Sequence, residues 1–420
     1  MFFRLNKKHL FNLVSLSLLS LQGIAAEVNF SGFMNVSATY ENSDEFEYST
    51  SFLSNRRDGF SIAADSSVGL QMEVSFSHEF DTVIQLVLDD SAETSLNNYI
   101  ELAFARYRIN RNLTARIGRI NSNGYLLSEF KPVSYAYPWI RPPKDYYAHA
   151  AVVSNIDGAD LQYRNNLGPG FITVTGQWGQ SKAAMYDDKN RVNLTVDSII
   201  VASVQYEIDY WLFKASSAQI DFGEYDSVIF SPAIKMLNTV PVQLWPDRPL
   251  VVDSISTTDK SMTYSALAIQ FDDAQWILQA EFGINHSNWA LNAIGHYGYA
   301  SLAYRVDQIT PYFRAGFFNP DATDLNYELP ELGDAVPEQQ QMQLAYLING
   351  INNELQQKID QNSLTLGARW DFFPGMALKV QADHYDIGKN GSNLWPKTER
   401  FKNQSSASVT VFSVSWNWVF

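Results

Sequence analysis

The last nine residues of the chain alternate between large apolar and small polar side chains. Because successive side chains of a strand point to opposite faces, this pattern predicts a strand with one apolar and one polar face. The segment 28–40 shows the same alternation, which only Phe33 interrupts. In the last strand the apolar face holds Phe412, Val414, Trp416, Trp418 and Phe420, and the polar face holds Ser413, Ser415 and Asn417.

Similar segments recur along the whole chain and bring the number of predicted strands to sixteen. Many exceed the usual strand length of about 5–6 residues, and a tilted strand needs about 9–11 residues to cross a membrane. Fourteen or eighteen strands would fit the same pattern, because strand edges are the feature that a sequence defines least well. The segments are 28–40, 68–80, 82–89, 98–109, 113–120, 157–164, 170–178, 193–206, 211–221, 259–271, 274–285, 294–305, 309–318, 360–371, 376–386 and 407–420.

The connections between these segments are of two kinds. Short ones contain Asn, Asp, Gly and Pro, which favour tight turns, and they lie at 78–82, 110–112, 165–169, 208–210, 272–273, 306–308 and 372–375. Long ones lie at 41–67, 90–97, 121–156, 179–192, 222–258, 319–359 and 387–406. Short periplasmic turns and long extracellular loops are typical of an outer-membrane barrel. We therefore predict an all-β protein with one domain, a transmembrane antiparallel β-barrel over residues 27–420.

Charged residues within the strands indicate what the barrel encloses. Arg369 and Asp371 alternate with Ala368 and Trp370. A charge that faces hydrocarbon near the midplane costs ~2–4 kcal/mol, so these charges belong in the lumen. A barrel of about sixteen strands is wide enough for an aqueous channel. The mean hydropathy of −0.19 fits a barrel that is polar inside, and the 14% of aromatic residues can supply its interfacial girdles.

The amino terminus has the features of a cleaved signal peptide. Arg4, Lys7 and Lys8 precede the apolar stretch 10–21, and small residues follow at 23–26. We expect residues 1–26 to be removed and the mature chain to be exported. The sequence has no cysteine, so no disulfide is available to hold the exported fold. The net charge of −15 argues against a nucleic-acid partner.

The third long segment, 121–156, is rich in aromatic residues and in proline. Proline stiffens the backbone, and a loop of this composition is expected to fold into the barrel. The alternative is an external loop that packs on its neighbours or on lipopolysaccharide. The aromatic residues are Tyr125, Phe130, Tyr135, Tyr137, Trp139, Tyr146 and Tyr147, and the prolines are Pro132, Pro138, Pro142 and Pro143.

The segment 319–359 is acidic, and its second half carries the one clear helical pattern after the signal. Leu344, Ile348, Ile351 and Leu355 recur at helical spacing and form one apolar stripe. Pro337 lies at an acceptable position for a helix start. We expect a helix within 337–359 that covers the barrel rim, and a lid over the mouth is the alternative.

No motif for catalysis or metal binding is present. The chain has no cysteine, no GxSxG and no HExxH, and nothing suggests a Ser–His–acid arrangement. We predict that the protein is not an enzyme and holds no cofactor and no dedicated metal ion. The acidic pairs Asp89–Asp90 and Asp187–Asp188 are interpreted as groups that meet the divalent cations bridging lipopolysaccharide. The histidines after the signal are His78, His149, His286, His296 and His384.

The chain resembles the sixteen-stranded porins of Gram-negative, gammaproteobacterial outer membranes. The resemblance lies in the signal peptide, the rhythm of strands and turns, the long loop after Arg116–Arg119, and the terminal Phe420. It implies a homotrimer that contacts its copies through the early strands and the last strand. It also implies that the assembly machinery reads the terminal strand. Candidate contacts are Gly32, Met34 and Val36, and candidate assembly signals are Trp416, Trp418 and Phe420.

In general porins the third long loop makes the pore constriction, so the resemblance implies that 121–156 does so here. Residues of this loop and of the basic hairpin before it are the candidates for constriction and selectivity: Arg106, Arg116, Arg119, Glu129, Lys131, Tyr137, Trp139, Arg141, Lys144 and Asp145. Strand parity forbids Arg116 and Arg119 from both pointing inward. Arg108 and Arg111 fit the periplasmic rim equally well. The loop is net basic, which departs from a pattern of cation preference and favours a mild anion preference through Arg106, Arg116, Lys131, Arg141 and Lys144.

The function expected from these features is passive diffusion of small hydrophilic solutes and ions. Aromatic residues beside basic ones could also bind sugars or organic anions, because ring faces stack on sugars and Arg pairs with carboxylates. A channel selective for sugars or for organic and inorganic anions is therefore one alternative. A plugged structural or adhesive barrel is the other.

Overall fold

A computed structural model describes residues 26–187, 190–227, 229–321, 325–389, 391–395 and 406–420. The predicted signal peptide lies outside the described residues except for residue 26. No helix among the described residues is long and apolar enough to span a membrane.

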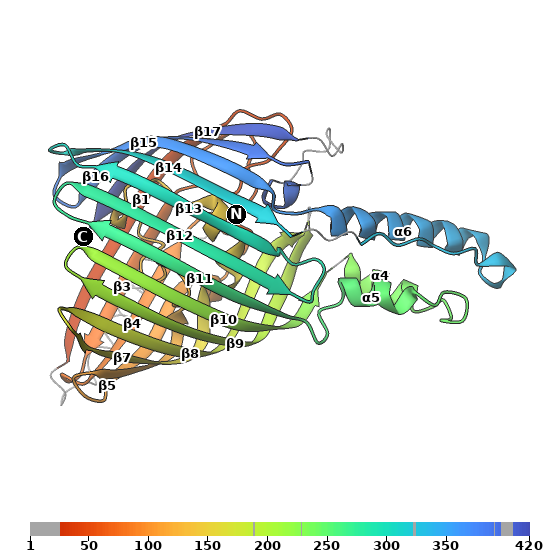
Figure 1. Ribbon diagram of the computed structural model, residues 1–420, viewed down its shortest axis with the longest axis horizontal. Helices are drawn as coiled ribbons and strands as arrows, with labels where there is room; N and C mark the ends of the chain where they lie inside the picture. Colours follow the sequence, from red (N-terminus) through yellow and green to blue (C-terminus); the bar gives the residue numbers. More distant parts are fainter. Residues whose placement is uncertain (1–25, 188–189, 228, 322–324, 390, 396–405) are drawn as a thin grey trace, which may run out of the picture.

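Sixteen long antiparallel strands form one closed barrel (Figure 1). The short strand β2 adds to β1, and β1 also pairs with β17 and with β3, which closes the sheet. The strands are β1 Glu27–Glu41, β2 Phe60–Ser61, β3 Ser67–Ser75, β4 Phe80–Leu88, β5 Ile100–Arg108, β6 Leu113–Asn121, β7 Asn155–Leu167, β8 Gly170–Asp187, β9 Asn190–Ile208, β10 Trp211–Asp226, β11 Ser261–Asp272, β12 Trp276–Ser287, β13 Gly295–Tyr304, β14 Ile309–Pro320, β15 Gln361–Phe373, β16 Met376–Ile387 and β17 Ala407–Val419.

The sixteen predicted strands each correspond to one long strand, and the seven predicted short turns are all present. We call the end of the barrel with these turns the turn end and the other end the loop end. One predicted loop, 179–192, is wrong. The strands β8 and β9 pair from the turn end up to Asp187 and Asn190, so most of this segment is a hairpin that extends the sheet.

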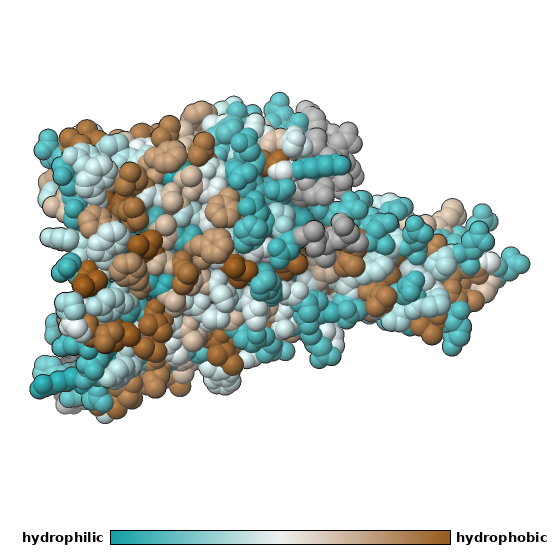
Figure 2. Space-filling model, in the orientation of Figure 1, coloured by the Kyte–Doolittle hydropathy of each residue, from teal (hydrophilic) through white to brown (hydrophobic). Residues whose placement is uncertain are grey.

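The two faces of each strand differ as the alternation predicts. In β1 the side chains of Asn35, Ser37 and Thr39 are buried inside the barrel, whereas Val36 and Tyr40 are exposed on its outer surface. The terminal strand β17 follows the same rule. The body of the barrel shows many apolar residues on its outer surface (Figure 2). The candidate trimer contacts Met34 and Val36 belong to this outer face.

The chain terminus closes the seam between β1 and β17. The backbone N–H of Gly32 donates to the carbonyl of Phe420 at 2.8 Å, and the N–H of Phe420 donates back to the carbonyl of Gly32 at 3.0 Å. The Phe420 ring covers Gly32 so closely that a Cβ at residue 32 would lie 2.5 Å from the ring atom Cζ. Only glycine therefore lets this ring pack flat on the seam.

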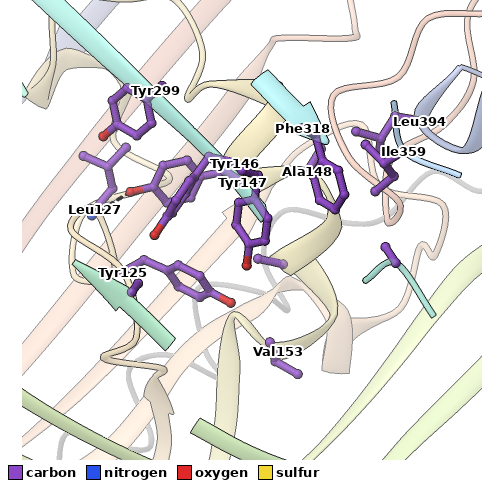
Figure 3. Packing of buried hydrophobic residues seen from close by; sticks show 14 of the residues in the cluster. Tyr125, Leu127, Tyr146, Tyr147, Ala148, Val153, Tyr299, Phe318, Ile359 and Leu394 are labelled. Carbon is purple, nitrogen blue, oxygen red and sulfur yellow. Dashed lines mark hydrogen bonds between the residues drawn. The ribbon is translucent and has the colours of Figure 1, made fainter. Parts of the chain in front are cut away.

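The lumen contains one large cluster of buried hydrophobic residues. Inward side chains of the barrel wall, such as Val83, Phe104 and Ile220, belong to the same cluster as aromatic residues of the loops. Figure 3 shows Tyr125, Tyr146 and Tyr147 of the segment 122–154 gathered within it. The prediction that the third loop folds into the lumen is confirmed. We refer to residues 122–154 as the lumen loop.

The helices are of two kinds. Some are single short turns, and the others belong to an extension that projects beyond the loop end of the barrel (Figure 1). The short ones are α2 Leu96–Tyr99, η1 Ser134–Ala136, α3 Lys144–Tyr147, η2 His149–Val153, η3 Gly333–Ala335 and η4 Ser392–Leu394. The extension contains α4 Phe230–Leu237, α5 Arg248–Ile255 and α6 Glu338–Gln356. Its own hydrophobic cluster includes Leu237, Val251 and the predicted stripe of α6.

The helix expected within 337–359 is thus confirmed as α6, but two further helices of eight residues each accompany it. Two helices lie in 222–258, where none was predicted. The helix α6 packs its apolar stripe on these neighbours rather than on the barrel rim. The extension points away from the barrel (Figure 1).

The seam yields the first prediction. Gly32→Val is expected to lower the free energy of unfolding by about 1–3 kcal/mol, because the new side chain displaces the Phe420 ring. Gly176 also faces outward, and a Cβ there meets no atom within 4 Å, so Gly176→Val is the matched control. Urea unfolding in detergent, followed by tryptophan fluorescence, measures both. Equal losses in the two variants would contradict the proposed role of the Gly32–Phe420 contact.

Candidate functional site

The lumen loop follows the inner wall of the barrel and is held by hydrogen bonds along its length. Near its start, the Lys214 ammonium of β10 donates to the Asn123 side chain and to the Tyr125 carbonyl, both at 2.6 Å. Farther along, the Trp139 indole N–H donates to Ser301 of β13 at 2.8 Å. Within the described part of the chain, its bonds to strands reach β6, β8 and β10–β17, and none goes to β3–β5.

Basic residues of β15 and β16 donate hydrogen bonds to carbonyl groups of the lumen loop. Lys379 of β16 is fully buried and donates to the carbonyls of Ser134, Tyr137 and Trp139 at 2.5, 2.8 and 2.6 Å. Arg369 of β15 donates to the carbonyl of Tyr135 at 2.6 Å. These carbonyls lie in the short helix η1 and in the segment that follows it, where no described strand supplies backbone donors. The wall supplies the donors that the loop needs in order to be buried.

Arg141 is the centre of a buried ion network. Its guanidinium binds both carboxylate oxygens of Asp65, at 2.8 and 2.7 Å, and also binds Asp383 of β16 and Ser413 of β17. The side chains of Arg141, Asp65 and Asp383 are 5%, 2% and 0% exposed. Arg314 of β14 binds the same Asp383 at 3.2 Å. The charges of the two arginines and the two aspartates therefore balance, and the Arg141 charge is neutralised inside the protein.

Lys144 lies in a buried cage of aromatic rings. Its ammonium is 3.6 Å from the centre of the Trp395 ring and 5.1 Å from that of Tyr48, and it donates to the Ser49 carbonyl at 2.7 Å. Burial, and then the nearby positive charge of Arg141, lower the pKa of Lys144 to about 7. The residues of the cage come from the three segments 41–67, 121–156 and 387–406, so the cage holds these segments together.

The neighbouring Asp145 is also turned to the wall. Gln361 and Ser363 of β15 donate to its two carboxylate oxygens, each at 2.5 Å. Tyr137 and Trp139 are buried too, and the Tyr137 hydroxyl donates to the Lys131 carbonyl at 3.1 Å. The Lys131 ammonium donates to Ser154 at 2.8 Å. These four candidate residues hold the loop in place.

A cluster of tyrosines surrounds another buried carboxylate, Glu281 of β12. Tyr147 and Tyr299 both donate to it, the latter at 2.8 Å, and the Leu126 N–H donates at 2.9 Å. The hydroxyls of Tyr146 and Tyr264 lie 2.9 Å apart. The aromatic residues of the loop thus pack against each other and against the wall.

The basic hairpin of β5 and β6 faces the lumen and is matched by carboxylates. Arg106 binds Asp81 at 2.8 Å and Glu73 at 2.6 Å, and Arg108 binds Asp81 at 2.5 Å. Arg106 and Arg116 lie directly across from each other in the β5–β6 hairpin. The two like charges tolerate each other because a carboxylate lies beside each of them.

Arg116 links this wall to the lumen loop. Its guanidinium binds Asp160 of β7 at 2.5 Å and Glu129 of the loop at 3.3 Å. The Asp160 side chain is fully buried, whereas that of Glu129 is 52% exposed. Glu129 is therefore the candidate residue of the loop whose charge remains accessible to water. We call Arg106, Arg108, Arg116 and their carboxylates the arginine wall.

Arg119 does not join the other candidates. It binds Asp157 at 2.7 Å and the Asn97 carbonyl at 2.6 Å, and these partners lie on the opposite side of the sheet from Asp160. The parity argument thus holds, with Arg116 inward and Arg119 outward.

Sequence reasoning missed most partners of these residues. Asp65, Glu281 and Asp383 are acidic residues scattered over a loop and two strands, and no local motif connects them with the lumen loop. A usable signal was their parity, because Glu281 and Asp383 alternate with the apolar residues that face outward. Parity identifies an inward carboxylate but not its partner.

His149 belongs to the aromatic packing of the lumen loop. It packs edge-on against Tyr297 and Phe318, with ring centres 4.4 and 5.3 Å away. No group of three or more His, Cys, Asp or Glu side chains that could hold a metal ion occurs among the described residues.

The Arg141 network yields a stability prediction. Arg141→Met is expected to lower the free energy of unfolding by about 3–5 kcal/mol, because it leaves the buried Asp65 without its arginine and leaves Asp383 with Arg314 alone. Arg305 pairs with Asp272 at 2.7 Å, but both side chains are about one-third exposed, so Arg305→Met should cost at most about 1 kcal/mol. Guanidinium unfolding of the refolded proteins measures the difference. A loss of similar size in both variants would refute the importance of burial.

Lys144 yields a pH prediction. Its pKa is lowered in the folded protein, so between about pH 7 and pH 10 the unfolded chain binds more protons than the folded one. Stability contributed by this group therefore rises with pH across that window. Lys144→Met should remove this rise, which is checked by comparing the free energy of unfolding of both proteins at pH 7.5 and pH 9.5. Parallel changes in the two proteins would disprove the assignment.

Comparison with solved structures supports the fold. No family model matches the chain, and no curated protein matches it. Among solved structures, the chain is similar to an anion-selective porin from Comamonas acidovorans, with a TM-score of 0.54, 11% identity, and coverage of 94% of this chain and 100% of that one. It is also similar to the OmpF of Salmonella typhi in complex with daunomycin, with a TM-score of 0.51, 11% identity, and coverage of 94% and 97%. At this identity the similarity establishes the fold of an outer-membrane porin barrel.

Proposed function

We propose that the protein is an outer-membrane porin of a Gram-negative bacterium, a water-filled channel for passive diffusion of small hydrophilic solutes and ions. The observation that carries this proposal is the division of the lumen. The lumen loop is bound mainly to the wall of β10–β17, while the arginine wall lies on β3–β7 and contacts the loop through Arg116 and Glu129. Charged side chains that face a lumen need water or each other, and this wall keeps partly exposed charges such as Arg106 and Glu73, at 27% and 31%.

The constriction in this proposal lies between the arginine wall and the tip of the lumen loop that carries Glu129. The Glu129 carboxylate lies 3.3 Å from the Arg116 guanidinium, so this ion pair forms one border of the proposed passage. The rest of the loop is held by buried hydrogen bonds, so the width of the passage is set by a rigid scaffold. Arg106, Arg116 and Glu129 are the constriction residues we retain.

The mild anion preference expected from the sequence loses its physical support. Of its five cationic residues, Lys131, Arg141 and Lys144 are turned into the protein, and Arg106 and Arg116 are paired. The arginine wall sets three arginines against four carboxylates, namely Glu73, Asp81, Asp160 and Glu129. We therefore propose a weak cation preference, carried mainly by the exposed Glu129.

The partners follow from the location in the membrane, and they belong to the same proposal. The outer face of the early strands and of β17 would contact two further copies in a homotrimer, with Met34 and Val36 at the interface. Phe420 packs on Gly32, so its ring serves the seam in the folded barrel, and recognition by the assembly machinery would precede this packing. Acidic loop residues would meet cations bound to lipopolysaccharide.

A plugged barrel is the second candidate, and one observation favours it. The hydrophobic cluster of the lumen contains inward residues from strands far apart in the barrel, such as Leu102 of β5 and Tyr297 of β13, so it links distant parts of the wall. A sugar-binding channel has less support, because Tyr137, Trp139 and Tyr147 are buried by other protein groups and present no ring to water.

Conductance in a planar bilayer tests the porin proposal. The refolded protein should open in steps and, under a salt gradient, show a reversal potential of the sign for cations. Glu129→Lys should shift the cation-to-anion permeability ratio toward anions by about threefold, which is within the ~1 kcal/mol of two charges 4 Å apart in water. Glu79→Lys makes the same charge change in the turn 76–79 and should shift the ratio much less.

Three other results would each contradict part of this proposal. A reversal potential of the sign for anions in the wild type would restore the original expectation of anion preference. Equal shifts in the two variants would remove Glu129 from the constriction. The absence of any current from correctly folded protein would favour the plugged barrel.

A further inference from the structure

The helix α6 has a second stripe of residues on the side opposite to its buried stripe. The buried stripe belongs to the cluster that α6 shares with α4 and α5. Figure 1 shows these two helices on one side of α6, while its other side is open. The second stripe repeats at spacings of three and four residues, which keeps it on one face of the helix. We call it the outer stripe, and all its members are exposed: Gln339, Met342, Tyr346, Asn349 and Asn353.

The outer stripe has the composition of an interface rather than that of a solvated surface. Met342 and Tyr346 are 62% and 84% exposed, and the sequence has no charged residue from position 339 to position 353. The solvent face of a surface helix ordinarily carries charged residues. The centre of a protein–protein interface is depleted of Lys, Glu and Asp and enriched in Tyr and Met.

Another exposed apolar residue of the extension provides a contrast. Leu250 of α5 is 59% exposed, but Asp247, Arg248 and Asp253 all lie within three residues of it. Single apolar side chains among charges are normal on a protein surface. The outer stripe differs because its two large apolar side chains lie one turn apart on a face without charge.

The charge of the protein indicates which partner fits this face. A different protein would be selected by charges complementary to its own, and the outer stripe offers none. The chain has a formal net charge of −15, so two copies repel each other over most of their surfaces. Glu338 and Glu354 lie beyond the two ends of the outer stripe. A second copy therefore meets the least repulsion when the two outer stripes face each other.

The direction of the extension allows such a pairing. The copies of a barrel in one membrane share their orientation, so their extensions all project on the same side. Two neighbouring copies can then place α6 beside α6, with both helices running in the same direction. Spacings of three and four residues are those of a coiled-coil seam, where one polar residue such as Asn fixes the register. In a parallel pair, each residue of the seam meets its own counterpart.

The outer stripe is small for an interface. The helix α6 has 19 residues, so it is about 28 Å long, and a helix is about 10 Å wide. One face therefore covers about 300 Å² per copy, against ~800 Å² per partner in a standard interface. Two freely diffusing molecules would bind weakly through it. Insertion in one membrane holds the copies side by side and raises their effective concentration.

We propose that the outer stripe of α6 binds the outer stripe of a second copy in the same membrane. The two helices form a parallel pair in which Tyr346 packs on its counterpart and the Asn349 amides bond across the seam. This contact is separate from the trimer contact proposed on the early strands and β17, because the extension arises between β10 and β11 and between β14 and β15. It depends on the location in a membrane and not on conduction.

Cysteine cross-linking tests this proposal, because the chain has no cysteine of its own. Tyr346→Cys and the control Leu250→Cys are produced in cells, and the isolated outer membranes are oxidised with copper phenanthroline. Tyr346→Cys should yield at least fivefold more disulfide-linked dimer on a non-reducing gel than Leu250→Cys. Heat-dependent mobility on gels shows first that both variants fold.

A further cysteine tests the direction of the pair, and a charge tests the seam. Asn353→Cys should also form dimers, because parallel helices bring each residue to its own counterpart, whereas antiparallel helices would separate the two copies of residue 353. Tyr346→Glu, added to Asn353→Cys, should reduce the dimer about fivefold by placing like charges at the seam. Leu250→Glu, added to Asn353→Cys, makes the same charge on the same extension and should leave the dimer unchanged.

Three results would overturn the proposal. Equal amounts of dimer in Tyr346→Cys and Leu250→Cys would mean that the cross-links record only random collisions. Dimers of Tyr346→Cys without dimers of Asn353→Cys would contradict the parallel pair. A cross-linked product in which mass spectrometry finds a different polypeptide would assign the outer stripe to another protein.

Discussion

Closure of the sheet is the constraint on which the whole molecule depends. A backbone N–H or C=O without a partner costs several kcal/mol in hydrocarbon, so a sheet can cross a membrane only if it has no free edge. Here β1 and β17 meet and complete the circle. Closure fixes which side of every strand faces outward, and a one-residue slip would exchange the two sides. The polar lumen and the apolar exterior are therefore consequences of one continuous hydrogen-bonded ring.

The inside of this ring is organised in two halves. Along β10–β17 the lumen loop replaces water as the partner of the inward side chains. Along β3–β7 the arginines pair with carboxylates of the wall, and Arg116 also pairs with Glu129 of the lumen loop. A buried ion pair adds little net stability, because desolvation offsets the attraction. Its value here lies in position: Arg141 can satisfy Asp65 and Asp383 together in one arrangement, which fixes the loop against the wall.

Most of the barrel could be predicted from the sequence, because alternation with a period of two is repeated in every strand. The extension of the β8–β9 hairpin beyond residue 179 was predicted as a loop. Strands that extend beyond the membrane no longer need an apolar outer face, so the alternation that marks the other strands is weaker there. The helices α4 and α5 were missed because each is only about two turns long. Their stability comes from packing on α6, which a local pattern does not contain.

The site was less predictable than the fold. The composition of the lumen loop indicated its place inside the barrel, and parity separated Arg116 from Arg119. The expected net positive charge failed as a guide, because the neutralising groups Asp65, Asp160 and Asp383 come from other parts of the chain. A count of charges within one loop describes a free loop, whereas burial pairs each charge with whatever the fold brings near.

The seam also has a consequence for contacts between chains. The strands that join there come from the first and last parts of the described chain, and β17 pairs with β16 on one side and with β1 on the other. A sheet without β17 would leave the edges of β1 and β16 unpaired, and an unpaired edge is a template for the addition of a strand from another chain. The strand that completes the barrel therefore also protects it against pairing with other molecules.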